Sequence, residues 1–240
     1  MARPPVEPTS QRLLQAAGEV FAEHGFRAAT VRQICDRAGA NVAAINYHFR
    51  DKETLYGEVV RYASARVVET YPFDPKPKGA TPELRLRALV RNYLMRFFDP
   101  NLAWYGKLIC RELAEPTDFF EEIVESDVRH YADQLTEAVK EFLGDEISSE
   151  RLRMCSNSVA GQCLLYPYTR LILARLYPDD VITTDFIDRL VEHITQFSIA
   201  GLRGTRKRAA GKRRRISRTN GRPSASQILK TNRSSARPPD

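Results

Sequence analysis

The chain has 240 residues, of which 42% are hydrophobic and 28% charged, enough for one or two domains with a substantial core. Its net charge of +7 arises at one end, because Arg203 to Asp240 hold 13 Lys or Arg and one acidic residue; this tail carries +12, which leaves −5 for residues 1–202. Overall basicity is therefore excluded as evidence of nucleic-acid binding, which has to be argued from local clusters.

The first elements expected are a Pro-rich, disordered arm over residues 1–8 and a helix from Ser10 to His24, with Gly25 just past its end. Thr30 and Gln33 fit a capping box, which predicts the start of a second helix. Gly39 accepts a positive φ and is expected to end that helix. Residues 10–39 are therefore predicted to form one longer helix followed by a short one.

A third helix is expected directly after this glycine, with Asn41 as its N-cap. Ile45 and Phe49, four residues apart, anchor it on the core. The preceding helix has its own inward stripe of Val31, Ile34, Cys35 and Ala38. Two short helices joined by a tight turn are typical of a helix-turn-helix, whose second helix lies in the major groove of DNA. The alternative is an amphipathic helix pair in an ordinary bundle.

The outward face of the third helix suits DNA. The small residues Ala43 and Ala44 permit close approach to thymine methyl groups, and Asn46 can bond adenine. The hydroxyl, imidazole and cationic groups that follow can contact phosphates. The residues expected to bind DNA are Thr30, Arg32, Gln33, Asn41, Ala43, Ala44, Asn46, Tyr47, His48 and Lys52.

The rest of the chain predicts further helices and no strand alternation, so the fold class expected is all-α. The N-terminal three-helix domain is followed by a linking helix that Asp51 opens and that runs to about Thr70. After a Pro-rich break at residues 71–82, helices are expected at 82–98, 102–114, 118–143, 149–177 and 184–202. Pro167 is expected to kink the fourth of these.

The segment 204–240 is poor in apolar residues and rich in Arg, Ser and Gly, so it is expected to be a disordered basic tail. One interpretation is a solubilising extension or a coding accident at the end of a gene. The other is an electrostatic tether to DNA or RNA. Both stay open from the sequence.

Nothing in the sequence points to an enzyme, a metal, a cofactor or a membrane. The four cysteines (Cys35, Cys110, Cys155 and Cys163) are far apart, which favours buried reduced thiols. There is no Gly-rich phosphate loop, GxSxG or HExxH. Residues 1–10 lack the apolar core of a secretory signal, and the most apolar stretch, 159–177, contains two arginines. A cytoplasmic location is expected.

The run from Leu13 to Leu55, with "AEHGF", "ATVRQICDRAG", "YHF" and "DKETLY", resembles the DNA-binding domain of TetR-type repressors. "RELAEPTDFFEEIVESDVRHYADQL" and "SVAGQCLLYPYTRLIL" resemble the C-terminal domain of the CecR-like branch. The resemblance implies a homodimer on a double-stranded, palindromic operator and a ligand cavity in each body. The expected divisions are an arm at 1–8, the DNA-binding domain at 9–55, a helical ligand-binding and dimerisation domain at 56–203, and the tail at 204–240.

Two features of the body fit that resemblance and also have a simpler explanation. The apolar stripes on the last two helices, which include Leu190 and Ile194, serve either a dimer interface or the core of one chain. Aromatic and polar residues serve either a cavity or a core. The candidates for contact with a ligand are Tyr93, Phe97, Trp104, Tyr105, Arg111, Phe119, Phe120, Gln162 and Tyr166.

The function expected is a sequence-specific DNA-binding transcriptional regulator, a repressor released from its operator by a small apolar ligand of unknown identity. The alternative is an architectural nucleic-acid-binding protein dominated by the basic tail. A DNA footprint that survives removal of the tail distinguishes the two.

Overall fold

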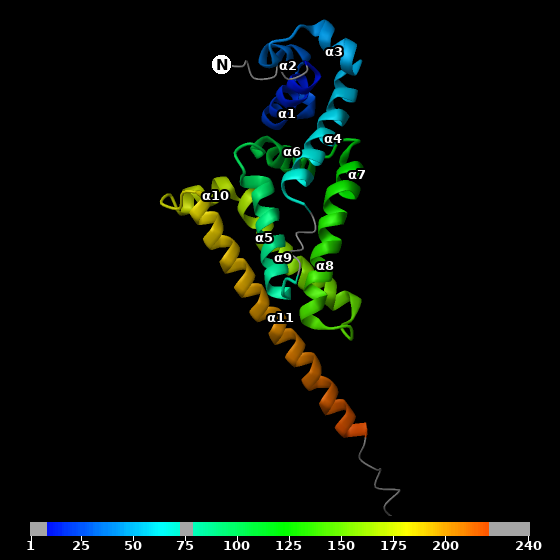
Figure 1. Cartoon of the computed structure of the whole chain (residues 1–240), viewed down its shortest axis with the longest axis vertical. Helices are drawn as coiled ribbons and strands as arrows, with labels where there is room; N and C mark the ends of the chain where they lie inside the picture. Colours follow the sequence, from blue (N-terminus) through cyan, green and yellow to red (C-terminus); the bar gives the residue numbers. More distant parts are fainter. Residues whose placement is uncertain (1–8, 73–78, 221–240) are drawn as a thin grey trace, which may run out of the picture.

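The computed structural model describes residues 9–72 and 79–220, and for 209–220 it describes the backbone only. All regular structure in these ranges is helical, as the all-α class predicts (Figure 1). The helices are α1 (Thr9–Ala28), α2 (Val31–Ala38), α3 (Val42–Phe49), α4 (Lys52–Thr70), α5 (Pro82–Phe98), α6 (Ala103–Ala114), α7 (Phe120–Ile123), the π-helical turn η1 (Val124–Val128), α8 (Arg129–Leu143), α9 (Ser149–Tyr168), α10 (Arg170–Leu176) and α11 (Thr184–Asn220).

The local signals for the first three helices are confirmed. Gly25 has φ 78° near the end of α1, and Gly39 has φ 61° at the end of α2. Thr30 and Gln33 form the complete capping box, and the Asn41 side chain accepts from the backbone N–H of Ala44 at 2.9 Å. Each helix therefore begins or ends where a side chain or a glycine satisfies its backbone.

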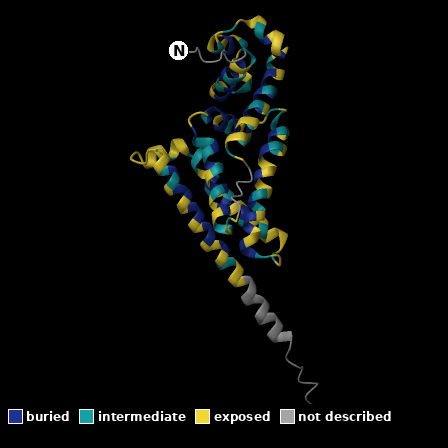
Figure 2. Ribbon diagram, viewed as in Figure 1, coloured by how far each residue is buried: buried dark blue, intermediate teal, exposed yellow. Residues whose placement is uncertain are grey.

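Two hydrophobic cores organise the described residues. The first joins α1–α4 to α6 and includes Phe21, Ile34, Ile45 and Tyr56. The second joins α5, α8, α9 and α11, and it buries the inward side of α11 while α10 stays exposed (Figure 2). We call the unit of α1–α3 the head and the unit of α5–α11 the body. The long helix α4 begins in the head and descends along the body (Figure 1). The boundary expected between residues 55 and 56 falls inside this continuous helix.

Three helices differ from their expected extent. The run 118–143 contains a π-helical turn, and the run 149–177 breaks at Thr169, two residues after Pro167. Proline has no N–H to donate, so the last turn of α9 is weakened there. The last helix does not end at Leu202 but continues to Asn220. Residues 204–220, expected to be disordered, are described as helical backbone, which suits their Arg, Lys and Ala content. Disorder of the tail stays a prediction. The expectations for 1–8 and 221–240 lie outside the described residues.

Candidate nucleic-acid interface and internal cavity

Helix α3 lies at the outer end of the head and presents a free face (Figure 1). Ile45 and Phe49 are buried, whereas Ala43, Asn46 and His48 are exposed. Tyr47 is 84% exposed and stacks edge-on against the ring of His48. Ala44 is half-buried and packs against the first core, so it lies at the border of this face.

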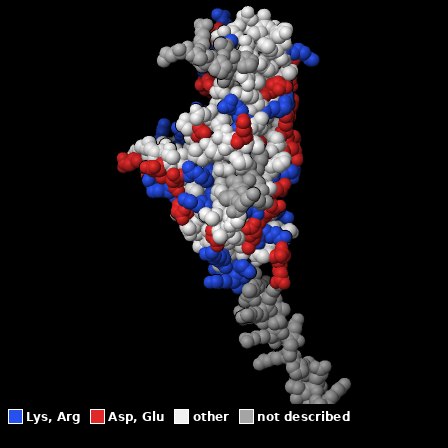
Figure 3. Space-filling model, in the orientation of Figure 1, with Lys and Arg blue, Asp and Glu red and all other residues white. Residues whose placement is uncertain are grey.

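The capping residues among the expected DNA contacts have an intramolecular role. The side chains of Thr30 and Gln33 bond each other's backbone N–H groups, and that of Asn41 caps α3. They hold the two helices in position. Arg32 is exposed on α2. In Figure 3 further Lys and Arg side chains lie at the outer end of the head, while acidic ones follow the flank over α7 and α8.

Lys52, expected to contact a phosphate, has hydrogen-bond partners inside the head. Its ammonium group donates to the carbonyl oxygens of Phe26, Arg27 and Ala29 at 2.9, 3.4 and 3.0 Å, and it lies 4.7 Å from the centre of the Phe26 ring. An ammonium group has three donors, and all three are used. Lys52 therefore joins the end of α1 to the start of α4 inside the head.

The body contains an internal cavity of about 250 Å³ that opens to the surface, since the exposed residues Val128 and Asn157 are part of its lining. Of the expected ligand contacts, Tyr93, Phe97 and Tyr105 line it. The sequence analysis missed Arg96, Asp127 and Tyr131, which also line it. The cavity is otherwise mostly apolar, with Ile109, Ile123, Leu135, Ala160 and Leu164 among its walls. An apolar space with a few polar groups is typical of small-molecule sites.

The other six candidates do not line this cavity. Trp104 packs against Gly18, and Arg111 donates to the carbonyls of Ala22 and Glu23 at the end of α1. Phe119 packs against Gly57 and Tyr56, and Phe120 is half-buried at the start of α7. Gln162 donates to the Ser198 hydroxyl, and Tyr166 lines an open groove beside Phe186. Trp104, Phe119 and Gln162 thus have partners on neighbouring helices, whereas Arg111 and Tyr166 line other pockets of the surface.

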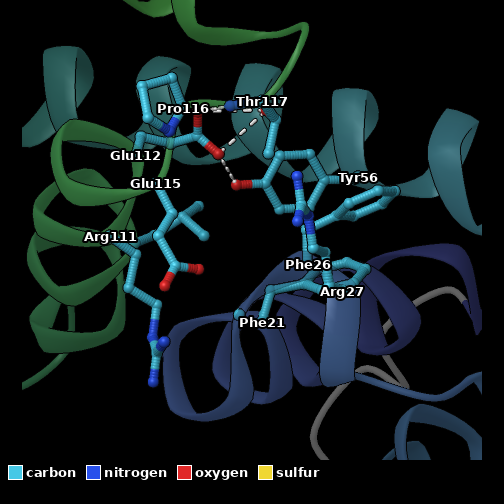
Figure 4. Close-up of a pocket in the computed structure, with 11 residues that line it drawn as sticks. Phe21, Phe26, Arg27, Tyr56, Arg111, Glu112, Glu115, Pro116 and Thr117 are labelled. Carbon is cyan, nitrogen blue, oxygen red and sulfur yellow. Dashed lines mark hydrogen bonds between the residues drawn. The ribbon is translucent and has the colours of Figure 1, made fainter.

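A second pocket, of about 510 Å³, lies where the head meets the body, between α1, α4 and α6 (Figure 4). There the Tyr56 hydroxyl donates to the buried carboxylate of Glu112, which also accepts from the Thr117 N–H at 3.1 Å and hydroxyl at 3.0 Å. Burial and the neighbouring carboxylate raise the pKa of Tyr56. This contact ties the upper part of α4 to the body.

The internal cavity is tied to α4 as well. Oδ2 of Asp127 accepts from the Ser64 hydroxyl at 2.7 Å and from the Tyr105 hydroxyl. Arg96 donates to the Tyr71 carbonyl, one residue past α4, at 2.6 Å. Asp127 thus bonds α4 itself, and Arg96 bonds the residue that caps its C-terminal end.

Asp127 belongs to the π-helical turn η1, a feature frequent at functional sites. The sequence does contain a signal for the role of Asp127 in the cavity wall. Ile123, Asp127, Tyr131 and Leu135 follow one another at intervals of four, so a carboxylate stands on an otherwise apolar stripe. Burial raises the pKa of Tyr105, and the charge of Asp127 raises it further. Burial lowers the pKa of Arg96.

Comparison with known proteins assigns this chain to a family. A family model described as "Bacterial regulatory proteins, tetR family" matches residues 13–59. A second, described as the C-terminal domain of the HTH-type transcriptional dual regulator CecR, matches residues 82–202. The chain belongs to the TetR family. Its C-terminal domain is of the CecR type.

Relatives within the TetR family support this assignment. CecR of Shigella flexneri is 30% identical over 172 residues, which are 67% of this chain and 76% of CecR. The transcriptional repressor AcnR of Corynebacterium efficiens is 43% identical over 60 residues, only 25% of this chain and 32% of AcnR. The chain is therefore a relative of transcriptional regulators along most of its length and of AcnR in the head alone.

Solved structures share the TetR-family fold. A TetR-like regulator from Rhodococcus sp. RHA1 has a TM-score of 0.59 at 18% identity and covers 83% of this chain and 100% of its own. FadR from Bacillus subtilis, solved with stearoyl-CoA, has a TM-score of 0.60 at 16% identity and covers 80% and 98%. At these identities the likeness concerns the fold alone.

The described part of this TetR-family chain holds no group of three His, Cys, Asp or Glu side chains placed to bind a metal ion. No helix in the same ranges is both long and apolar enough to cross a membrane. All four cysteines are free thiols; Cys35 and Cys163 are buried, and the other two half-buried.

Proposed function

We propose that this TetR-family protein is a repressor that binds a palindromic operator as a homodimer and leaves it when a small, mostly apolar ligand enters the internal cavity. The observation that carries the proposal is a pair of hydrogen bonds between the cavity wall and α4 or its C-cap: the Ser64 hydroxyl donates to Asp127, and Arg96 donates to the carbonyl of Tyr71, the residue after α4. A ligand that moves either side chain acts directly on the helix that positions the head.

DNA recognition is assigned to the exposed face of α3. Ala43 and Asn46 are placed to read bases, while Tyr47, His48 and Arg32 contact phosphates. Their exposure supports these roles, because Tyr47 is 84% exposed and Asn46 is exposed as well. We leave Lys52 out of this proposal because its ammonium group donates to backbone carbonyls within the head.

The homodimer is assigned to the exposed apolar side of α9, α10 and α11. Leu171 is 82% and Phe197 65% exposed, and the other exposed residues there include Met154, Leu165, Tyr168, Ile172 and Leu176. Several large apolar side chains on the same helices, unlike single exposed ones, favour burial against a protein partner. Leu190 and Ile194 are not part of it, because both are buried in the second core of their own chain.

The release mechanism is a shift between two arrangements of the dimer. The reading helices have to lie about 34 Å apart, one turn of DNA, or a multiple of that distance. A tilt of α4 changes the separation. A ligand that binds the released arrangement about 100-fold better supplies roughly 2.7 kcal/mol of coupling. FadR, solved with stearoyl-CoA, is a structural neighbour that holds a ligand with a long apolar chain.

The experiment is selection of bound DNA from a random library, for the full chain and for a chain ending at Leu202. We expect one palindromic motif from both chains. Asn46→Ala should relax one base position of each half-site at a cost of roughly 1–3 kcal/mol. Binding without sequence preference that disappears with the tail would instead favour the architectural alternative.

A further inference from the structure

Residues 203–220, here called the basic segment, begin at the end of the body that is remote from the head. Arg203 on α11 pairs with Glu83 in the first turn of α5 at 2.6 Å. Helix α5 runs from there to the other end of the body, where Phe97 packs against Gly106 of α6, and α6 packs on α1 of the head. At 1.5 Å per residue, α5 alone separates these two ends by about 25 Å. The described backbone of α11 then leads farther away from the head (Figure 1).

The basic segment carries a dense positive charge that the described residues do not balance. It contains nine Lys or Arg and no Asp or Glu. Arg206, Lys207 and Arg208 are exposed, and none of them forms an ion pair with the described part of the chain. In Figure 3, Lys and Arg side chains gather at the lower end of the described surface. Like charges three and four residues apart on a helix repel each other, so a polyanion laid along the segment relieves that repulsion.

The uncharged residues of the segment limit the kind of polyanion. A helix that lies on a lipid surface needs a broad apolar face, whereas the only apolar side chains here are Ala209, Ala210 and Ile216. Single-stranded nucleic acid is held by stacking on aromatic side chains, and no Phe, Trp or Tyr occurs from residue 203 to 240. Duplex DNA offers one phosphate charge about every 1.7 Å and needs neither feature. It is also the polymer on which the proposed function places this protein.

We propose that the basic segment binds a second DNA duplex, without sequence preference, while the exposed face of α3 holds the operator. The two contacts lie at opposite ends of the chain, so one protein joins two duplexes or two distant parts of one (Figure 1). In a homodimer that places both heads on one operator, both basic segments leave on the side away from it. The inference goes beyond the proposed function, which concerns α3 and the cavity alone.

The first measurement needs no operator. It follows the fluorescence anisotropy of a short duplex of arbitrary sequence with the full chain over a range of salt concentrations. A glutamine variant removes the charges and keeps good helix formers; its eight changes are Arg206→Gln, Lys207→Gln, Arg208→Gln, Lys212→Gln, Arg213→Gln, Arg214→Gln, Arg215→Gln and Arg218→Gln. About half of the charges around a helix can face one duplex. We therefore expect the slope of log affinity against log salt to fall by about 3.6, which is 0.9 for each of roughly four phosphate contacts. An unchanged slope would overturn the proposal.

The second measurement distinguishes a second duplex from the one under the heads. Operator duplex from the library selection is fixed on beads, saturated with the full chain and washed, and a fluorescent duplex of unrelated sequence is added. We expect the full chain to capture the fluorescent duplex and the glutamine variant to leave it at the level of bare beads. The matched control keeps the charge and changes only arginines, as Arg206→Lys, Arg208→Lys, Arg213→Lys, Arg214→Lys, Arg215→Lys and Arg218→Lys. It should capture as well as the full chain, because a contact through counterion release depends on charge.

Three results of the capture would contradict a second DNA duplex. The first is operator binding by the full chain without capture. The second is loss of capture in the lysine variant, since the contact would then depend on guanidinium geometry. The third is stronger capture of duplex RNA, or of vesicles that contain phosphatidylserine, than of duplex DNA, because the segment would then have a different partner.

The two measurements separate this inference from the proposed function. If the glutamine variant loses slope and the library yields no motif, the proposal of a repressor fails while duplex binding by the segment stands. An arbitrary duplex at low salt then replaces the operator on the beads, so that capture is still measured. If a motif is found and neither slope nor capture depends on the segment, only the inference about the basic segment fails.

Discussion

Replacing Lys52 by methionine separates a structural role from a DNA contact. Methionine keeps an apolar stem of similar length and removes the ammonium group. The variant loses three hydrogen bonds, to the carbonyls of Phe26, Arg27 and Ala29, and the contact with the Phe26 ring. These bonds join the end of α1 to the start of α4, so we expect the head to be destabilised.

The magnitude follows from the number of bonds and their exposure. Hydrogen bonds to a charged group contribute about 1.5–3 kcal/mol each when buried. Lys52 is half-buried and one of its bonds is long, at 3.4 Å, so solvent competes for the same donors. A total of about 2 kcal/mol is a reasonable figure. For a chain of this size it lowers Tm by roughly 4–8 °C.

The assay pairs a thermal melt with the salt dependence of operator affinity. For Lys52→Met we expect the lower Tm and an unchanged slope of log affinity against log salt. Arg32→Met is the matched control, because Arg32 is exposed at the head surface. It should keep its Tm and lose about 0.9 of that slope for one phosphate contact. An unchanged Tm in Lys52→Met together with a slope reduced by about 0.9 would refute the structural role.

Thr30→Ala removes the α2 cap and should cost about 1 kcal/mol, whereas Thr30→Ser should cost little; equal stability of the two in urea would contradict this. Burial and Asp99 raise the pKa of Tyr71 to about 12, and burial raises that of Tyr105. The unfolded phenols ionise near pH 10, so the stability that these two tyrosines contribute should be fully present below that pH and fall as pH rises toward about 12. The free energy of unfolding of Tyr71→Phe should fall less steeply over that range in urea titrations. Leu171→Glu should yield a folded monomer in ultracentrifugation, whereas Leu190→Glu should lower Tm sharply; a dimeric Leu171→Glu would reject the assigned interface.

Local signals in the sequence predicted the helical framework well. The Thr30–Gln33 capping box, the glycine at 39 and the proline at 82 set helix ends that the structure reproduces. These features act within a few residues through backbone hydrogen bonds, so they can be read without knowing the fold. The inward residues Ile45 and Phe49 followed from helical spacing in the same way.

Contacts between distant residues were decided by the tertiary structure. Ser64 and Asp127 are 63 residues apart and meet only because α4 lies beside the π-helical turn. Spacing marks Leu190 as apolar but does not say whether its own chain or a partner covers it, and packing places it in its own core. In the sequence Lys52 has the pattern of a surface cation, whereas in the structure its ammonium group donates to three backbone carbonyls at and just after the end of α1. Helical periodicity tells which side of a helix is apolar, whereas the neighbour of each side chain depends on how the helices pack against one another.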